Sequence, residues 1–373
     1  MADGTFLLQL LMGPTIARPV PAPLTDALTG VTVTTSAQAR SGFQLTFAVS
    51  RNSLISTVLL PTGFFDPKIR VIVLVVLGGT PTVLTDGVIT RQELSASDIP
   101  GQATLTVTGE DLTLLMDLIH EYACFPRMPL HTRVERICEK YADYGIVPTA
   151  VPPVLMEVPK PTDIPVQSAT DLTYIQALAA KAGYVFYLEP TRLPGATIAY
   201  WGPEIRVGVP QPALSVNMDA ASNVESLSFS FDGLARTQMT VRVTEPFTKR
   251  SVPVPIPDVG LLRPPLAARP AVALREAPVP DTAKLSTVQA ALFGVAQTAR
   301  ASDAISGQGR LDVLRYGAIL RARALVSVRG AGLAYDGLYY VTSVTDTIKR
   351  GEYKQSFSLA RDGLVAQTPR VIV

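Results

Sequence analysis

A chain of 373 residues is long enough for two or three domains with substantial apolar cores. It carries 33 basic and 31 acidic residues, for a net charge of +2. This balance gives no support for a polyanion partner, since nucleic-acid-binding proteins usually carry a basic stripe. Only 17% of residues are charged and the mean hydropathy is +0.27. Two explanations stay open: extensive subunit contacts, because obligate interfaces resemble a divided domain core, or a β-rich core of Val, Leu and Ala.

Membrane insertion and secretion are not expected. The most apolar run, Ile69–Leu77, is far shorter than the roughly 20 residues that span a bilayer, and Arg70 interrupts it. The apolar segment Phe6–Met12 lacks the basic leader of a signal peptide. Two cysteines, Cys124 and Cys138, make no disulfide framework. We therefore expect a cytoplasmic protein.

The first third of the chain is β-rich. Residues 1–30 are expected to form an arm with a short apolar start. Short turns separate five strand-like segments, which favours a small antiparallel barrel. The segments are Val31–Thr35, Phe43–Val49, Val71–Leu77, Val83–Thr90 and Ala103–Thr108. The loop Arg51–Pro67 carries four apolar residues, which either plug one end of that barrel or touch a neighbouring subunit. They are Leu59, Leu60, Phe64 and Phe65.

The middle of the chain mixes helices and strands. Apolar spacing and caps predict three helices and two strands. The helices are Leu112–Tyr122, Thr132–Tyr144 and Leu172–Ala182, and the strands are Tyr184–Leu188 and Thr197–Trp201. Val147–Pro165 is rich in proline and is expected to be extended.

The last third returns to β structure around a proline-rich insert. Val224–Phe231 and Gln238–Val243 alternate as strands do, Ala283–Ala304 is predicted as a helix and Ala318–Val328 as a strand. Pro246–Pro280 should lie outside the barrel as an extended strap, since proline cannot donate to a central ladder.

The chain closes with a predicted β-hairpin, in which Leu338–Ile348 and Tyr353–Leu359 flank a turn at Gly351.

The order of these segments indicates an internal repeat. Val31–Ser50 matches Val224–Val243, and Val71–Leu77 matches Ala318–Val328. The dipeptide Asp86-Gly87 opens a strand, as Asp336-Gly337 does. In this interpretation the second copy carries its insert between its second and third strands.

The closing hairpin, with the sequence DGLYYVTSVTDTIKRGEYKQSFSLARDGL, resembles the C-terminal hairpin of the late-control protein D family. These are baseplate hub proteins of contractile phage tails, and they share a fold with the upper part of type VI secretion VgrG spikes. Further stretches with family character follow in the expected order. They are Asp86–Asp117, Gln167–Pro190, Tyr200–Val216 and Gly309–Gly317.

The resemblance implies a mainly β fold with an α+β insert, in which two tail-tube-like antiparallel barrels flank a small mixed α/β region. The expected domains are 1–110, 111–220 and 221–373, the last with a proline-rich and helical insert at 245–317. In the family, three subunits present six barrels, so that a trimer adapts a six-fold inner tube to a three-fold spike. The implied partners are the tube or tube-initiator protein above, a spike below and other baseplate proteins. Because the sequence ends at Val373, shortly after the hairpin, the spike is expected to be a separate polypeptide.

Chemical sites are few in the sequence. His120, Cys124, His131 and Cys138 lack tight zinc-ligand spacing, and neither cysteine sits in a nucleophile elbow. The glycines at 307, 309, 330 and 332 match no phosphate-binding motif and are interpreted as turn residues. Glu110, Asp111 and Asp117 are assigned to capping and surface roles rather than to a glycosidase pair. The sole tryptophan, in Tyr200-Trp201-Gly202-Pro203, is either a structural anchor or a ligand platform.

These patterns leave three classes of function to compare. The first is a structural hub that acts through interface geometry, with no catalytic residues, cofactor or metal. The alternative is a carbohydrate- or peptidoglycan-binding module that uses the middle region. Such a binder should show clustered exposed aromatics, whereas Trp and Tyr here are scattered and fall mostly at strand positions. The third, an enzyme, should show a polar constellation at loop tips, and none emerges.

Overall fold

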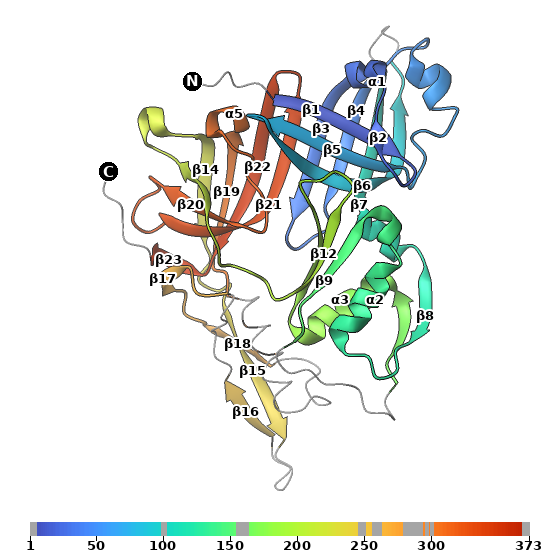
Figure 1. Ribbon diagram of the computed structural model, residues 1–373. Coiled ribbons are helices and arrows are strands. Elements are labelled where there is room, and N and C mark those ends of the chain that lie inside the picture. The colour runs from blue at the N-terminus through green and yellow to red at the C-terminus, as the bar shows by residue number, and fades with distance from the viewer. Residues whose placement is uncertain are drawn as a thin grey trace.

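The computed structural model describes residues 6–97, 103–153, 164–244, 251–255, 263–278, 294, 298 and 302–367. A single 13-stranded sheet joins the β-rich first and last thirds of the chain (Figure 1). Its strands follow in the order β14 (Val224–Phe231), β19 (Ile305–Asp312), β22 (Glu352–Arg361), β21 (Gly337–Lys349), β3 (Leu28–Ser36), β4 (Gly42–Val49), β7 (Ala103–Asp111), β6 (Thr80–Ser95), β5 (Arg70–Leu77), β1 (Phe6–Gly13) and β2 (Arg18–Pro19). Two further strands branch from β21, first β20 (Leu325–Arg329) and then β13 (Gln211–Ser215).

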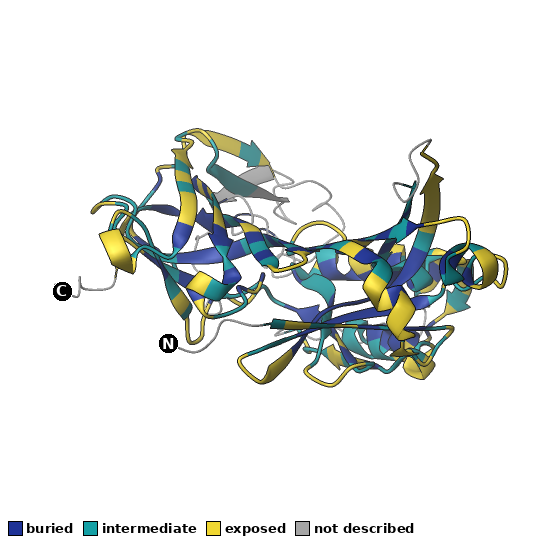
Figure 2. Cartoon of the chain, turned by 90° about the horizontal axis from the view of Figure 1, so that it is seen from above, coloured by how far each residue is buried: buried dark blue, intermediate teal, exposed yellow. Residues whose placement is uncertain are grey.

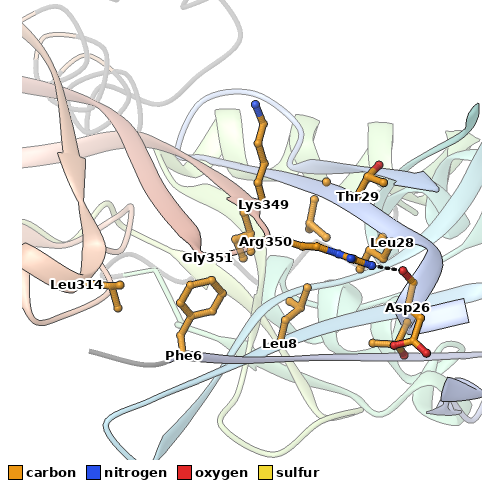
Figure 3. Close-up of a pocket in the computed structure, with 13 residues that line it drawn as sticks. Phe6, Leu8, Asp26, Leu28, Thr29, Leu314, Lys349, Arg350 and Gly351 are labelled. Atoms are coloured by element: carbon orange, nitrogen blue, oxygen red, sulfur yellow. Dashed lines mark hydrogen bonds between the residues drawn. The ribbon is translucent and has the colours of Figure 1, made fainter. Parts of the chain in front are cut away.

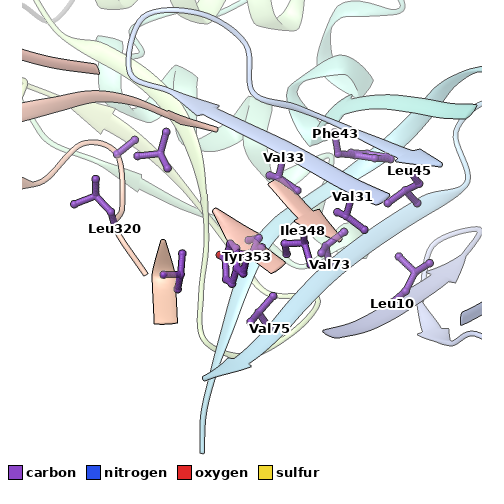
Figure 4. Close-up of a cluster of buried hydrophobic side chains, with 14 of the residues drawn as sticks. Leu10, Val31, Val33, Phe43, Leu45, Val73, Val75, Leu320, Ile348 and Tyr353 are labelled. Atoms are coloured by element: carbon purple, nitrogen blue, oxygen red, sulfur yellow. The ribbon is translucent and has the colours of Figure 1, made fainter. Parts of the chain in front are cut away.

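The alternation predicted for these strands places one face of the sheet in the core. In β4, Phe43, Leu45, Phe47 and Val49 are exposed by 4% or less, and the less buried residues Gln44, Thr46 and Ala48 alternate with them. Figure 4 shows that core residues come from both thirds of the chain, and Val31 of β3 lies opposite Ile348 of β21. Burial of each large apolar side chain contributes about 1.5–3 kcal/mol. Figure 2 shows the buried residues along the sheet and the exposed ones mainly at loops and outer surfaces.

The internal repeat is present in the sheet. The order β3-β4-β7-β6-β5 in the first β region matches β14-β19-β22-β21-β20 in the second. Even the bulges correspond: pairing shifts at residue 29 in β3 and at residue 225 in β14, and again at residue 90 in β6 and at residue 342 in β21. Among the described residues neither set of strands closes into a barrel, because the sheet stays open from β14 to β2.

The second strand of the second copy is β19, and the prediction that it is Gln238–Val243 was wrong. That segment lies in β15 (Thr237–Thr244), which forms a separate sheet with β16 (Ser251–Pro255) and β18 (Arg275–Pro278). The intervening chain therefore separates the first and second strands of the copy, and β19 belongs to the main sheet although it falls within 245–317. The predicted match of Asp86-Gly87 to Asp336-Gly337 is also out of register. Arg70 begins β5 and pairs with Val88, whereas Leu325 begins β20 and pairs with Tyr340, so Val88 corresponds to Tyr340.

The middle region has its own core, formed around Trp201 and Ile137. Its elements are η2 (Leu112–Asp117), β8 (His120–Cys124), α2 (Leu130–Glu139), η3 (Ala142–Tyr144), β9 (Ile146–Ala150), β10 (Val166–Thr170), α3 (Asp171–Ala182), β11 (Val185–Pro190), β12 (Thr197–Gly202) and η4 (Asp219–Ala221). The predicted helix α3 is confirmed: Thr170 accepts a hydrogen bond from the Thr173 amide, and Gly183 ends the helix with a positive φ of 70°.

Two element predictions were wrong because tertiary contacts override local pattern. The helix predicted over Leu112–Tyr122 is the short 3-10 helix η2 followed by strand β8, which pairs with β10 along its whole length. The strand predicted over Ala318–Val328 begins only at Leu325. Ahead of it the amide of Leu320 donates to the buried side chain of Gln355, which draws this segment out of the sheet.

The N-terminal segment is more ordered than the predicted arm. Strand β1 pairs with β5 over eight residues, and helix α1 (Ala22–Ala27) leads into β3. In the loop between β4 and β5, the π-helix η1 (Ile55–Leu59) and Phe65 pack into the core, and Phe65 is fully buried. This favours the plugging role for the loop over contact with a neighbour.

The described part of the proline-rich insert lies outside the main sheet, as predicted. Besides β16 and β18, it contributes β17 (Ala267–Pro270), which pairs with β23 (Gly363–Ala366). The helix predicted over 283–304 falls almost wholly outside the described residues. After β19, helix α5 (Val313–Tyr316) ends at Gly317.

Candidate functional site

The residues weighed as zinc ligands do not converge. His120 and Cys124 lie exposed on β8, whereas Cys138 is fully buried on α2. Within the described residues no group of three or more His, Cys, Asp or Glu is placed to hold a metal ion. Burial raises the pKa of Cys138 to about 12, so its thiol stays protonated and is a poor nucleophile. That the chain binds no zinc stays a prediction.

The acidic trio has structural partners. Arg40 binds Glu110, with 3.0 Å between Nη1 and Oε2, and also Asp117. The hydrogen bond that Thr170 donates to Asp117 lowers the pKa of that carboxyl, and Arg40 lowers it further. Asp111 accepts a hydrogen bond from the amide of Thr113 at the start of η2. These contacts fasten the first β region to the middle region.

The glycines and the tryptophan also have structural explanations. Gly307 and Gly309 are strand residues of β19 rather than turn residues, while Gly330 and Gly332 have positive φ. Trp201 is fully buried, and the ring of Tyr184 meets it edge-on at 4.8 Å. The tryptophan therefore offers no exposed platform for a ligand.

The strongest functional geometry is the contact between the two copies of the repeat, which we call the β21–β3 joint. Residues Ser343–Lys349 of β21 pair antiparallel with Gly30–Ser36 of β3. On the outer face the hydroxyls of Thr34 and Thr345 are 3.1 Å apart. Since backbone pairing runs across the joint, the two copies form one continuous surface.

A buried polar network supports the core face of this joint. Asp346, opposite Val33, accepts hydrogen bonds from the hydroxyl of Tyr353 at 2.7 Å and from Nε2 of Gln355 at 2.8 Å. Burial raises the pKa of Asp346 to about 6, although both hydrogen bonds lower it. A carboxyl at this position is therefore sensitive to mildly acidic pH.

Arginines tie the middle region to both copies. Arg323 pairs with Glu189 at 2.7 Å, donates to the carbonyl of Ser36 at 2.6 Å and stacks over Tyr187 at 4.2 Å. Arg70 forms a bidentate pair with Asp86 at the junction with η3 and β12. Arg323 thus links the middle region to both copies, and Arg70 links it to the first copy.

A cavity of about 460 Å³ opens at the end of the joint. Figure 3 shows Phe6 and Leu8 of β1 facing the hairpin turn, where Arg350 donates to the carbonyl of Asp26. Its lining combines apolar side chains with the polar and charged residues Thr25, Asp26, Thr29, Lys349 and Arg350, and it contains no His or Cys.

The main sheet has several strand edges without a partner among the described residues, including those of β2 and β13 as well as two within the repeat. The outer edge of β14 is unpaired, and its sequence VESLSFSF lacks the Lys and Pro that usually protect an edge. The other is one side of residues 91–95 in β6, because backbone pairing on that side ends at Ile89. Leu94 there is 55% exposed and Phe231 at the end of β14 is 43% exposed. Sequence analysis did not single out these edges, and the unprotected β14 pattern was the available signal.

No protein-family model matches the sequence, and no curated protein matches it. Solved structures do match it along nearly its whole length. A tail protein of prophage MuSo2 from Shewanella oneidensis aligns with a TM-score of 0.63 at 15% identity, covering 96% of this chain and 100% of that one. A tail protein from Neisseria meningitidis aligns with a TM-score of 0.61 at 14% identity, covering 96% and 98%. This chain has the fold of phage tail proteins.

The fold extends to type VI secretion proteins. A chain of the Francisella PdpA–VgrG complex aligns with a TM-score of 0.61 at 10% identity, and covers 98% of this chain but 54% of that one. The predicted mainly β fold and its resemblance to phage tail and VgrG proteins are thus confirmed at the level of the fold.

Proposed function

We propose that this protein is the baseplate hub of a contractile tail or injection machine. Three copies form a ring that adapts a six-fold inner tube to a three-fold spike. The observation that carries the proposal is the duplicated strand order, joined edge to edge in one sheet. Two like units per chain give six around a three-fold axis.

The remaining parts of the proposal follow the resemblance to tail hub proteins. The first and last β regions, expected as domains 1–110 and 221–373, build the ring, and the middle region 111–220 braces it from outside. The tube or tube initiator docks above, a separate spike protein docks below and other baseplate proteins surround the ring. The protein acts through its interfaces rather than through catalysis. It is assembled in the cytoplasm and ends in the finished particle.

No helix in the described part of the chain is long and apolar enough to cross a bilayer.

A cryo-EM map of the intact particle tests the proposal. We expect three copies of this chain at the junction between tube and spike, with six similar β units around the lumen. Six copies at that junction, or none, would contradict the hub assignment. Native mass spectrometry of the protein bound to its tube partner gives a second measurement, with a mass of three chains expected.

A further inference from the structure

The internal repeat predicts more than the number of units, because it identifies the surfaces that join one chain to the next. Within one chain, β21 of the second copy pairs with β3 of the first copy. By strand order, β6 is the counterpart of β21, and β14 is the counterpart of β3. These counterparts, the free part of β6 and the outer edge of β14, are the two unpaired edges within the repeat described above.

The bulges fix the correspondence residue by residue. In β6 and β21 the pairing shifts between Ile89 and Arg91 and between Val341 and Ser343, so Leu94 corresponds to Asp346. In β3 and β14 the pairing shifts between Leu28 and Gly30 and between Val224 and Ser226, so Phe229 corresponds to Val33. The ladders β4–β7 and β19–β22 keep the same alignment, since Gly109 pairs with Phe43 as Leu359 pairs with Gly307.

We propose that residues 91–95 of β6 pair antiparallel with residues 228–232, the end of β14 and the residue after it, in a second copy of this chain. This inference rests on the proposed function, which it deepens. Copying the β21–β3 register, in which Asp346 is opposite Val33, puts Leu94 opposite Phe229. It also puts Glu93 opposite Ser230 and Arg91 opposite Asp232.

The side chains on the two edges fit this register. Leu94 is 55% exposed in the single chain and becomes covered by the half-buried ring of Phe229. Arg91, 71% exposed and paired at 3.0 Å only with Glu93, gains the opposite charge of Asp232. No two like charges face each other. Opposite-charge and apolar cross-strand pairs each stabilise a sheet by about 0.2–1 kcal/mol.

The contact also satisfies backbone groups that otherwise remain unpaired at both edges. It is heterologous, since one chain contributes β6 and its neighbour contributes β14, and such a contact closes into a ring when the rotation allows. Repeated three times, it leaves neither edge free, which removes the hazard of an unprotected strand.

Disulfide trapping tests the register in the assembled, full-length protein. In a Cys124→Ser background, Glu93→Cys is combined with Ser230→Cys, because these positions are opposite on the outer face. Directly opposed residues lie within the Cα distance of a disulfide. The matched control combines Glu93→Cys with Ser228→Cys, two residues out of register. We expect covalent dimers and trimers after oxidation, with roughly fivefold more product than the control because the diagonal pair is too far apart.

Charge exchange provides a second measurement that does not depend on thiol chemistry. Arg91→Glu should weaken ring formation by about fivefold per joint, in line with the loss of one cross-strand pair. Adding Asp232→Arg should restore it. Both positions are exposed, and circular dichroism confirms folding of each variant.

The outcomes separate the two proposals. A ring that forms without preferential Glu93–Ser230 trapping, or without rescue by the exchanged charges, would overturn the register and leave the hub function standing. A protein that remains a single copy within the native particle would overturn both.

Discussion

The buried ion pair between Arg70 and Asp86 helps to attach the first β region to the middle region. The two side chains are only 3% and 1% exposed. Arg70 donates to the carboxylate through Nε at 2.7 Å and Nη2 at 2.6 Å. It also donates to the carbonyls of Thr15 and Tyr144, while Thr197 donates to Asp86 at 3.1 Å. The substitution Asp86→Ala therefore leaves a buried guanidinium without its counter-charge.

The expected cost follows from these contacts. Removing one partner of a buried ion pair lowers the free energy of unfolding by about 3–5 kcal/mol. Arg70 keeps two carbonyl acceptors, so we expect a loss at the lower end, about 3 kcal/mol. The double variant Arg70→Met, Asp86→Leu should be more stable than Asp86→Ala, because no uncompensated charge remains. Thr197→Val removes a single hydrogen bond and should cost about 1 kcal/mol.

Urea unfolding followed by Trp201 fluorescence gives these differences, because that residue is the only tryptophan and lies buried in the middle region. A loss below about 1 kcal/mol for Asp86→Ala would refute the reasoning. So would a double variant that is as unstable as the single one.

Three further predictions concern single positions. Burial raises the pKa of Asp346 to about 6, above the unfolded value near 4, so the folded state binds this proton more tightly and loses stability as pH rises through 6. Asp346→Asn should remove this pH-dependent part of the free energy of unfolding, which amounts to up to about 3 kcal/mol between pH 4 and 7. Unfolding curves measured across this pH range test the prediction, and a variant with the pH profile of the unmodified protein would contradict it. Gly330→Ala should cost more than Gly332→Ala, since both have φ near 90° but only a Cβ at Gly330 would lie 1.8 Å from the carbonyl oxygen of Val216; equal melting temperatures would contradict the clash. Cys138→Ala should lower the free energy of unfolding by about 1 kcal/mol, whereas the exposed Cys124→Ser should leave it unchanged.

Local pattern predicted the elements whose partners are close in sequence. The β21–β22 hairpin and helix α3 carry their own turn and cap residues, namely Gly351, Thr170 and Gly183. Strand β19 was missed because its glycines were interpreted as turn residues. Their role depends on distant residues: a Cβ at Gly309 would lie 2.5 Å from Cζ of Phe357, and one at Gly307 would lie 2.9 Å from Cε1 of Phe229. These glycines make room for aromatic rings across the sheet.

The candidate interface could not be predicted from the sequence, for a related reason. The residues of β6 at 91–95 are polar apart from Leu94 and resemble an ordinary solvated strand end. Only the sheet order reveals that they occupy the same place as residues 343–347 of β21. The repeat itself was recognisable, but its alignment required the bulges, which leave no mark in the sequence.

The distance along the chain between β14 and β19 has a consequence for the order of folding. Ser228 and Gln308 are partners 80 positions apart, whereas Asp346 and Tyr353 in the closing hairpin are 7 apart. Loop closure is slower and entropically costlier for distant segments. During synthesis, β14 must wait for the insert and β19 to be completed before it has a partner. The β14 edge that we propose to bind a neighbouring chain therefore forms only after most of the subunit has been synthesised. An incomplete chain should then join a growing ring poorly.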